Sequence, residues 1–529
     1  MKKTMKRISV LDCTLRDGGY CNEWKFGLDN IKRVIKGLCT SNVEYIECGF
    51  LTNRVKYDKD KSKFTNLSQL SDIISDEKTD RCFLVMINYG EYAIEDLPNR
   101  SETCIDGIRV AFHKKDAKDA IDYCLEIKKK GYLVFVQPMV SMNYSAEEFV
   151  TLIHAVNQLK PYAFYIVDSF GMMKRKALMQ LVEMVEMNLV NDIHLGFHAH
   201  NNLQLAYSNA QYLAELPINF SLIIDASVHG MGRGAGNLNS ELFLDYLNEN
   251  CHSSYLIRPL LKMMDEIISG FYDEKKWGYS LPNYLSATHL IHPNYAAYLD
   301  DKKTLTLEAM DEIFDLIDPE KGCEYDAKYI ERLYIDYLSR REHEDLSINV
   351  LSKALQGKKV LLIAPGRNAV KQKERILRFA NREHPVIISV NYDYPYLKTD
   401  YIFVSNMRRF SQLSENVYDK TIITSNIKSM ETYACVDYYR LINTVDGVID
   451  NAGLMAIEFI MQRGITECYL AGFDGYSRDV YKNFESRDMA LVSSAELLEK
   501  INNGMRQVIK SFTKEIRLSF ITDTKYDVK

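Results

Sequence analysis

The sequence of 529 residues lacks any long apolar run and any concentrated cluster of basic residues. A membrane-spanning helix needs roughly 18 or more consecutive apolar residues, and no window of this chain approaches that length. The net charge is −6, and the Lys and Arg residues are spread along the chain. We therefore expect no membrane span and no nucleic-acid partner.

Cysteine pairs typical of metal sites or disulfide frameworks are also missing. The eleven cysteines are scattered and form no Cys-x-x-Cys pair, which is typical of free thiols in a reducing compartment. The first residues are basic, but only the short apolar run 8–11 follows before Asp12, so we expect no signal peptide. The expected location is therefore the cytoplasm.

Apolar runs of strand length alternate with amphipathic segments, such as 117–130 and 146–159, through the first 255 residues. Eight β/α units in roughly 245 residues match the size of a parallel (β/α)₈ TIM barrel. A doubly wound sheet is the alternative, but consecutive units without a long interruption favour closure into a barrel. The eight runs cover 8–13, 43–49, 82–87, 105–112, 132–138, 163–168, 193–200 and 222–228.

The rest of the chain divides into a helical segment and a second α/β region. From 256 to 345 the pattern is mainly helical and ends in a charged stretch, 340–345, that is typical of a linker. Strand-like and helical runs then alternate again, which predicts a Rossmann-like α/β domain. We predict three parts: a barrel over 1–255, a helical appendage with a linker over 256–345, and the Rossmann-like domain over 346–529.

Polar residues stand where the predicted barrel strands end. Because the carboxyl ends of barrel strands meet at one face, the fold would gather these side chains into one active site. Each alone is also compatible with a hydrogen-bonded structural role at a strand end. Besides the metal-ligand pattern below, the candidates for binding or acting on a substrate are Glu47, Arg109, His113, Gln137, Asp168 and Ser169.

Two histidines at the end of the seventh predicted strand form a metal-ligand pattern. His198 and His200 are two residues apart, so on a strand both imidazoles face the same side. A carboxylate from the end of the first strand could join them on one divalent ion. Two His and one carboxylate leave coordination positions open, as a catalytic metal requires. The pattern predicts metal-assisted chemistry on a small, oxygen-rich substrate.

Three motifs, in this order, resemble those of the DRE-TIM metallolyase superfamily. They are TLRDGG at 14–19, HAHNN at 198–202 and GMGRGAGN at 230–237. The resemblance covers roughly residues 7–300. The superfamily includes isopropylmalate synthase, hydroxymethylglutaryl-CoA lyase and 4-hydroxy-2-oxovalerate aldolase, so the resemblance implies a TIM barrel that makes or breaks a carbon–carbon bond beside a carbonyl.

The resemblance also implies roles for individual residues. Asp17, His198 and His200 would bind the metal, with Asn237 as a fourth ligand or a contact through water. Arg16 would hold the carboxylate and the ketone oxygen of a 2-oxo acid and stabilise an enolate. Mixed nitrogen and oxygen ligands suit Mn²⁺ or Mg²⁺, and Co²⁺ or Zn²⁺ are possible substitutes.

Within the superfamily, the glycine-rich segment 230–237 most resembles the 4-hydroxy-2-oxovalerate aldolases. This implies an aldol or retro-aldol reaction with pyruvate as the nucleophile and an aldehyde as its partner. That family carries a histidine base where this chain has Tyr20, and a tyrosine with an ordinary pKa near 10 is a poor base. Tyr20 would therefore move a proton through water, or another group would act as the base. The candidates for that group are His113, His229, His289 and His292.

The C-terminal region carries small and amide residues at its predicted strand ends. A turn with Gly366 before a helix suits a phosphate group, although one glycine in a turn also fits a packed domain without a ligand. The pattern of strand ends is distantly similar to bacterial sialyltransferases and related Rossmann-like domains, which bind a nucleotide-activated sugar. This similarity implies a nucleotide or sugar site lined by Gly366, Asn368, Asn391, Asn406 and Asp474.

Together these patterns predict a divalent-metal-dependent, class II pyruvate aldolase. Its acceptor would be a sugar-derived aldehyde, and Glu23 and Trp24 would shape the pocket for this aldehyde. Its product would serve surface polysaccharide biosynthesis. We expect pyruvate, an aldehyde and a nucleotide sugar as small-molecule partners, and a homo-oligomer. One alternative is a Claisen-type synthase that joins an acyl-CoA to a 2-oxo acid. Another is a non-catalytic binding protein in which the barrel is a relic.

Overall fold

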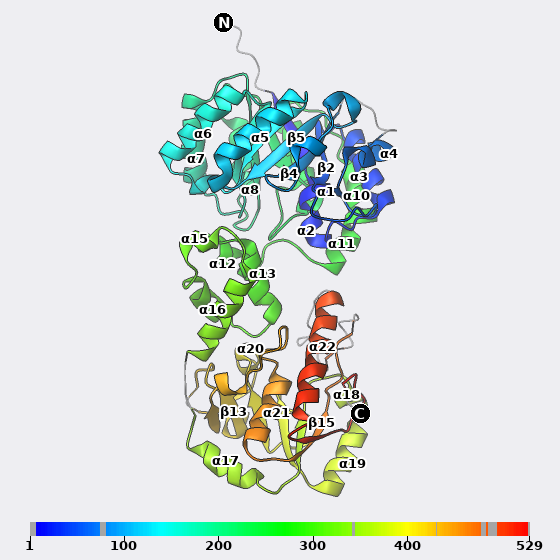
Figure 1. Cartoon of the computed structure of the whole chain (residues 1–529), viewed down its shortest axis with the longest axis vertical. Coiled ribbons are helices and arrows are strands. Elements are labelled where there is room, and N and C mark those ends of the chain that lie inside the picture. Colours follow the sequence, from blue (N-terminus) through cyan, green and yellow to red (C-terminus); the bar gives the residue numbers. More distant parts are fainter. Residues whose placement is uncertain are drawn as a thin grey trace. The chain divides into compact units, whose positions relative to one another are not determined.

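The computed structural model of the chain describes residues 7–74, 81–340, 344–429, 431–477, 483–484 and 495–526. The chain forms two compact units, whose elements are labelled in Figure 1. Unit 1 comprises Met1–Ala296 with Asp318–Tyr325, and unit 2 comprises Ala297–Ile317 with Asp326–Lys529. The predicted helical appendage is thus shared between the units. Residues 341–343 of its linker lie outside the described residues, and the three-part division stays a prediction.

Eight parallel strands close on themselves in unit 1, which confirms the predicted TIM barrel. The ring closes because β1 pairs with β2 on one side and with β9 on the other. A short additional strand, β3 (Lys63–Phe64), pairs with β2 outside the ring. The ring strands are β1 (Ile8–Asp12), β2 (Tyr45–Leu51), β4 (Cys82–Asn88), β5 (Gly107–Phe112), β6 (Leu133–Pro138), β7 (Ala163–Asp168), β8 (His194–Ala199) and β9 (Leu222–Ala226).

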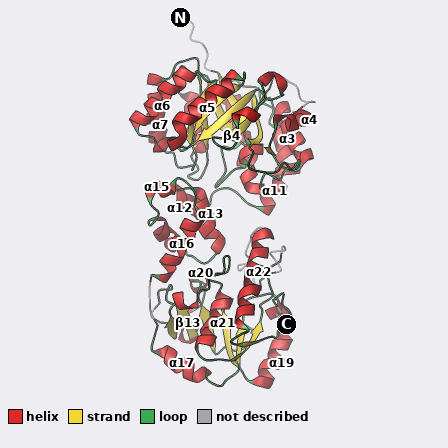
Figure 2. Ribbon diagram, in the orientation of Figure 1, coloured by secondary structure: helices red, strands yellow, loops and turns green. Residues whose placement is uncertain are grey.

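Amphipathic helices surround the strands, as Figure 2 shows by colour. In α6 the buried residues Phe149, Leu152, Ile153 and Val156 recur at three- and four-residue spacings, so one face of the helix packs on the barrel. The helices are α3 (Leu28–Thr40), α4 (Ser71–Ile74), α5 (Ala117–Lys129), α6 (Ala146–Leu159), α7 (Arg175–Asn188), α8 (Ala206–Glu215) and α9 (Ser240–Asn250).

One connection departs from the predicted regular alternation of strands and helices. Between β4 and β5 the chain forms only the 3₁₀ turns Ile94–Asp96 and Arg100–Glu102, with no α-helix in this fully described segment. Pro98 lies between the two turns, and proline both lacks an N–H donor and disfavours helical geometry in the residue before it. The expectation of eight complete β/α units is therefore corrected at this position.

Further helices follow the barrel, and no helix in the described part of the chain is long and apolar enough to cross a bilayer. Those with residues in unit 1 are α10 (Arg258–Met263), α11 (Ser269–Glu274), α12 (Leu281–Thr288), α15 (Pro319–Gly322) and the start of α13 (Pro293–Lys302). Those of unit 2 before its sheet are α14 (Leu307–Phe314), α16 (Ala327–Ser339) and α17 (Ser347–Leu355).

A parallel seven-stranded sheet forms the core of unit 2, as expected for a Rossmann-like α/β fold. The strand order is β14-β13-β12-β11-β10-β15-β16. The chain runs outward from β10 to β14 and then returns to the other side of β10, which creates a crevice at the strand ends. The strands are β10 (Val360–Ile363), β11 (Val386–Val390), β12 (Tyr401–Val404), β13 (Thr421–Thr424), β14 (Ala434–Val436), β15 (Glu467–Ala471) and β16 (Arg517–Phe520).

The sheet of unit 2 contains two edge strands that the sequence pattern does not indicate. β14 is only three residues long, and β16 is partly exposed along its length, so neither forms a long apolar run. The helices around the sheet are α18 (Asn368–Lys371), α19 (Lys373–Glu383), α20 (Met407–Phe410), α21 (Ala452–Gln462) and α22 (Ala495–Phe512).

Candidate active site

Three buried side chains meet at the carboxyl ends of the barrel strands. Asp17 ends the short helix α1 (Thr14–Asp17), which follows β1, and His198 and His200 lie at the end of β8. The ligand atoms of these three residues all lie within 4.8 Å of one another. In the described part of the chain, no other group of three or more His, Cys, Asp or Glu residues comes close enough to share an ion. The fold thus brings together the three predicted metal ligands.

Each histidine is oriented by an acceptor at its Nδ1 atom. His198 Nδ1 lies 2.9 Å from Asp225 Oδ2, and His200 Nδ1 lies 3.2 Å from the carbonyl oxygen of Arg233. These acceptors favour a proton on Nδ1, which leaves each Nε2 with a free lone pair. His200 Nε2 lies 3.8 Å from Asp17 Oδ2. Metal-binding imidazoles are typically held in this way.

Burial and neighbouring charges keep His200 and Asp17 in the protonation forms that bind metal. Burial lowers the pKa of His200 to about 3, so the imidazole is neutral at pH 7. Burial by itself would raise the pKa of Asp17, but Arg16 and the two histidines hold this pKa below its ordinary value. The neutral imidazole of His200 beside the ionised carboxylate of Asp17 is suited to hold a divalent cation.

Asn237 lies beside Asp17, where a fourth ligand was predicted. Its Nδ2 donates to Asp17 Oδ2 at 2.7 Å, whereas its Oδ1 is buried and meets no donor among the described residues. A buried oxygen without a partner is costly unless a ligand occupies it. A Cβ atom at Gly232 would lie 2.3 Å from Asn237 Nδ2, so a glycine is needed to let these groups approach. The residues present therefore fit a divalent ion.

Arg16 directs an unused donor into the same site. Its Nη1 donates to Asp17 Oδ1 at 2.5 Å and its Nε donates to Glu47 Oε2 at 2.8 Å. Its Nη2 is buried and meets no acceptor among the described residues. Burial opposes the charge, but Glu47 and Asp17 raise the pKa of Arg16 well above its ordinary value, so the guanidinium stays charged. The free N–H group beside the metal ligands suits a substrate oxygen.

Three of the predicted substrate-binding residues lie inside the barrel and support other side chains. Arg109 is fully buried, donates to Glu47 Oε2 at 2.8 Å and also pairs with Asp225. With its amide oxygen turned toward Arg109, Gln137 accepts from Nη2 at 3.1 Å. Glu47 and Arg109 therefore link Arg16 to Asp225, the partner of His198. Direct contact of these residues with a substrate stays a prediction.

Asp168 and Ser169 organise the loop after β7. The Asp168 carboxylate accepts from the backbone N–H groups of Met172 and Met173 at 2.9 and 3.0 Å. Burial raises the pKa of Asp168 to about 6. The carbonyl oxygen of Ser169 accepts from Arg233 Nη2 at 2.8 Å. Both residues thus shape the rim of the site, and their binding of substrate stays a prediction.

Tyr20 and His113 lie at the carboxyl-end face of the barrel and are not in contact with each other. Tyr20 belongs to the short helix α2 (Gly19–Asn22), and the Arg233 guanidinium lies 5.4 Å from the centre of its ring. Burial raises the pKa of Tyr20, which makes its phenolate form still rarer at pH 7. His113 Nδ1 lies 3.9 Å from Glu324 Oε1 and its side chain is 38% exposed, so it lies at the outer edge of the site.

Two of the remaining candidate bases occupy different surroundings. His292 lies beside Arg233, with 3.2 Å between its Nε2 and Nη1 of the arginine, and burial lowers its pKa well below the usual range. His229 packs its ring against Tyr272 and Trp277. His292 is thus the one of these two that contacts a group at the rim of the site.

Sequence reasoning missed Asp225 and Arg233. Asp225 is a lone carboxylate within the apolar run of β9, and a charged residue in a buried strand could have indicated a partner such as His198. Arg233 is the one charged residue within the segment 230–237. Its backbone carbonyl, which meets His200, carries no sequence signal.

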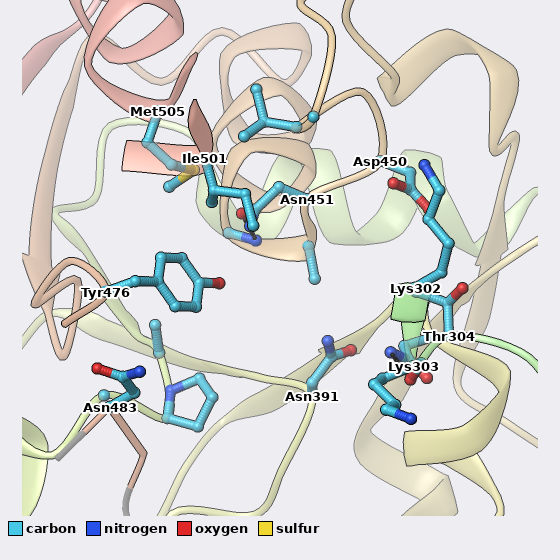
Figure 3. Close-up of a pocket in the computed structure, with 18 of the residues that line it drawn as sticks. Lys302, Lys303, Thr304, Asn391, Asp450, Asn451, Tyr476, Asn483, Ile501 and Met505 are labelled. Carbon is cyan, nitrogen blue, oxygen red and sulfur yellow. Dashed lines mark hydrogen bonds between the residues drawn. The ribbon is translucent and has the colours of Figure 1, made fainter. Parts of the chain in front are cut away.

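A second candidate site lies within unit 2, at the carboxyl ends of its strands. A cavity of about 390 Å³ opens where β10, β11, β12 and β15 end, next to the N-terminus of α21. Gly472 has φ +72°, and a Cβ atom there would lie 2.1 Å from the carbonyl oxygen of Ala364, so glycine permits the two strand ends to approach. Figure 3 shows the cavity with Tyr476, Asn483, Ile501 and Met505 on one side and Lys302, Lys303, Thr304 and Asp450 on the other.

Four of the five residues predicted for this site line the cavity, namely Gly366, Asn391, Asn406 and Asp474. Asn368 does not line it. Its backbone N–H donates to Asp474 Oδ2 at 2.6 Å and its side chain donates to the carbonyl oxygen of Asp523 at 2.9 Å. Asn368 therefore positions Asp474, whose Oδ1 is buried without a partner in the described part of the chain.

Comparisons with known proteins agree with the geometry of the barrel. The HMGL-like family matches residues 107–256. The chain is 29% identical over 243 residues to "4-hydroxy-2-oxovalerate aldolase 2" of Comamonas testosteroni, which covers 45% of this chain and 68% of the relative. It is 26% identical over 270 residues to the 4-hydroxy-2-oxovalerate aldolase of Bacillus thuringiensis strain Al Hakam, covering 50% and 76%.

A solved structure supports the fold. Pyruvate carboxylase T882A of Rhizobium etli, crystallised without acetyl coenzyme A, matches with a TM-score of 0.50 at 13% identity, covering 67% of this chain and 39% of that one. The fold, the sequence relatives and the Asp–His–His group together identify the type of domain in unit 1. Its barrel is an HMGL-like domain of the DRE-TIM type, and the chain is an enzyme of the aldolase and lyase group.

Proposed function

We propose that the barrel is a divalent-metal-dependent pyruvate aldolase that joins pyruvate to an aldehyde or releases pyruvate from the product. The observation that carries this proposal is the unused Nη2 donor of Arg16 beside the group formed by Asp17, His198 and His200. A divalent ion held there would act as a Lewis acid on the ketone of a 2-oxo acid. Mn²⁺ and Mg²⁺ suit the ligands, with Co²⁺ or Zn²⁺ as substitutes.

The residues of the chain would bind pyruvate and stabilise the negative charge of its enolate. Arg16 would donate from Nη2 to the substrate oxygen, while Glu47 and Asp17 hold its other nitrogens in place. A fixed guanidinium in a buried site stabilises a developing oxyanion strongly because no solvent needs to reorganise. Asn237 Oδ1 would accept from water or from a ligand of the ion.

Tyr20 would act in its neutral form. Because burial raises its pKa, the hydroxyl group keeps its proton at pH 7 and is suited to donate it to the oxygen of the aldehyde in the direction of bond formation. Proton removal from pyruvate would then fall to a second group at the rim, with His113 and His292 as the candidates. Substituting each of these histidines by Gln in turn would show which of the two removes the proton from pyruvate.

Exchange of the pyruvate methyl protons tests the aldolase proposal. The purified protein would be incubated with pyruvate in D₂O with Mn²⁺ or with chelator, and the methyl signal followed by NMR after removal of the metal. We expect metal-dependent exchange that His198→Ala abolishes. His194→Ala, at the opposite end of β8, is the matched control and should keep it. Wild-type protein that shows no exchange, but releases thiol from acetyl-CoA with a 2-oxo acid, would replace the aldolase by a Claisen-type synthase.

For unit 2 we propose binding of a nucleotide or a nucleotide-linked sugar, in line with a role in surface polysaccharide synthesis. The cavity combines aromatic and aliphatic side chains with amide and carboxylate groups, which suit a ring and its hydroxyl groups. Thermal stability would be measured with cytidine, uridine and guanosine nucleotide sugars. We expect at least one to raise the melting temperature, and Asn391→Leu to remove this effect while Asn349→Leu, outside the cavity, retains it. No shift with any of them would contradict the proposal.

A further inference from the structure

A hollow in unit 1, the lysine pocket, lies at the same end of the barrel as the candidate active site, and its lysines have not been assigned a role so far. It is formed by the loop that follows β2, together with Trp24. The loop leaves the carboxyl end of β2, so it belongs to the same face of the barrel as the metal ligands. The charged residues that line the pocket are Lys56, Lys59, Lys61 and Lys63, opposed by Glu23 and Asp58.

The four lysines of this pocket outnumber its two carboxylates, and in the described part of the chain none of the four forms an ion pair. Among the described residues, no carboxylate oxygen lies within 4 Å of the ammonium group of any of the four lysines, whereas Glu23 is engaged by Lys25 at 2.8 Å. The Lys63 ammonium lies 3.4 Å from the centre of the Trp24 ring, and burial lowers the pKa of this lysine. Because like charges that form no ion pair with a carboxylate repel one another, the excess of lysines favours binding of an anion.

The pocket is held in shape by the backbone around Trp24. Glu23 and Trp24 have φ values of +56° and +61°, a left-handed conformation that side chains other than glycine rarely adopt. Such conformations persist where surrounding contacts fix them. Here the carbonyl oxygen of Trp24 accepts from the Ser62 N–H at 3.0 Å, and the Ser62 hydroxyl donates to the carbonyl oxygen of Leu15 at 2.6 Å. The loop that carries the lysines is therefore tied to α1.

Trp24 also connects the pocket with the active site. Its Nε1 donates to the carbonyl oxygen of Arg16 at 2.7 Å, and the centre of its ring lies 4.7 Å from the centre of the Tyr20 ring. A Cβ atom at Gly19 would lie 2.1 Å from the Trp24 ring, so the glycine lets the indole pack directly against α2. The indole thus contacts the element that carries Tyr20 on one side and the Lys63 ammonium on another.

We propose that the lysine pocket binds a phosphate monoester at the far end of the aldehyde substrate, so that the substrate class is a phosphorylated aldehyde. This inference rests on the proposed aldolase function. A phosphate monoester carries a charge of about −1.5 to −2 at pH 7, and ammonium groups bind it as point charges. Lys63 and Lys61 would contact the phosphate, and Trp24 would form the wall between the phosphate and the reacting carbonyl.

Phosphate binding can be measured without turnover because Trp24 is one of only two tryptophans in the chain. Tryptophan emission would be followed during titration with inorganic phosphate, with ionic strength held constant by chloride. We expect a saturable change that is absent from Trp24→Phe and whose half-saturation rises at least tenfold in Lys63→Met. Lys36→Met, an exposed lysine on α3, is the matched control and should titrate like the wild type.

Substrate preference provides the second measurement. We expect the wild-type kcat/KM with pyruvate to be at least tenfold higher for glyceraldehyde 3-phosphate than for glyceraldehyde, and Lys63→Met to reduce this ratio toward one. Equal use of both aldehydes by the wild type, or no saturable phosphate titration, overturns the proposal. A third outcome is that Lys63→Met weakens phosphate binding but the phosphate group of the aldehyde has no effect on kcat/KM. This outcome identifies free phosphate as the ligand and also overturns the proposal.

The two proposals can fail separately. Proton exchange in wild-type protein with pyruvate alone tests the aldolase chemistry and needs no aldehyde. If exchange occurs but phosphate does not bind, the aldolase function stands and the lysine pocket has no role in substrate binding. If phosphate binds but no exchange or aldol product is found, the pocket binds an anion and the substrate assignment falls with the aldolase function.

Discussion

The two histidines of the candidate metal site depend on different kinds of acceptor. His198 is oriented by the side chain of Asp225, which also pairs with Arg109. His200 is oriented by the backbone carbonyl of Arg233, which any residue at that position would supply. Side-chain substitution can therefore remove the support of His198, whereas substitution at Arg233 leaves the acceptor for His200 in place.

Asp225→Asn should weaken metal binding without removing a ligand. The amide can no longer act as a charged acceptor for His198 Nδ1, and loss of such a support typically costs about 10- to 100-fold in metal affinity. Calorimetric titration with Mn²⁺ would measure the change. Asp192→Asn, at an exposed position before β8, is the control and should bind Mn²⁺ like the wild type. An unchanged affinity in Asp225→Asn would show that the carboxylate does not support His198.

Asp12→Asn should change how stability depends on pH. Burial raises the pKa of Asp12 to about 6 from 3.8, so between these pH values the folded chain binds a proton that the unfolded chain has released. The stabilising contribution is therefore complete below about pH 3.8 and is lost as the pH rises through 6. The asparagine can still accept from the Thr14 N–H and donate to the Ser240 hydroxyl.

The expected result is that Asp12→Asn gains stability relative to the wild type above pH 6, by up to about 3 kcal/mol for a shift of about two pKa units. The gain should disappear near pH 4. Thermal melts of both proteins at pH 4, 5, 6 and 7.5 would measure it. A difference in melting temperature that stays constant across this range would contradict the raised pKa.

At the scale of elements, the loop after β7 is held by the side chain of Asp168. Asp168 ends β7 and accepts from two backbone N–H groups of the loop, while Arg233 donates to Ser169 from the neighbouring segment. Hydrogen bonds to the side chain at the end of β7 thus fix the shape of this loop. It forms part of the rim through which a substrate would enter.

Asp168→Ala should loosen this loop locally. The variant leaves the N–H groups of Met172 and Met173 buried without acceptors, and one such group costs about 1–3 kcal/mol. Hydrogen exchange followed by mass spectrometry should show at least about tenfold faster exchange in the segment 169–174. Asp168→Asn, which keeps one acceptor oxygen, should lie between the variant and the wild type. Identical exchange in all three proteins would rule out this role of the carboxylate.

At the scale of the whole molecule, each unit has its own parallel sheet and its own candidate site at the carboxyl ends of its strands. The barrel gathers charged ligands into a small buried group, whereas the open sheet of unit 2 leaves a cavity where the strand order reverses. Ligands for the two sites should therefore stabilise different parts of the chain.

Metal addition should protect unit 1 and leave unit 2 unchanged. A ligand at 100 times its dissociation constant stabilises the fold it binds by about 2.7 kcal/mol. Hydrogen exchange with and without Mn²⁺ should slow in peptides around Asp17, His198 and Asn237, and chelator should reverse the effect. The variant His200→Ala should lose the protection. Equal protection of peptides from β10 to β15 would contradict a metal site confined to the barrel.

The barrel and its candidate metal ligands could be predicted because their patterns are local. Strand β7 (Ala163–Asp168) was predicted with its exact bounds, since a buried parallel strand is a continuous apolar run. His198 and His200 are two residues apart, and alternation along a strand is enough to place both on one face. The prediction of a helix between β4 and β5 was wrong because Pro98 interrupts the segment.

The sequence alone determined the repeating β/α pattern, the candidate ligands and the absence of a membrane-spanning run. Tertiary structure decided which polar residues face the site and which support it, because this depends on contacts between residues far apart in the chain. Arg109 belongs to a network with Glu47 and Asp225 that no local pattern encodes. The meeting of Lys63 with Trp24 likewise required the loop after β2 to fold back onto α1, which hydrogen bonds of Ser62 bring about.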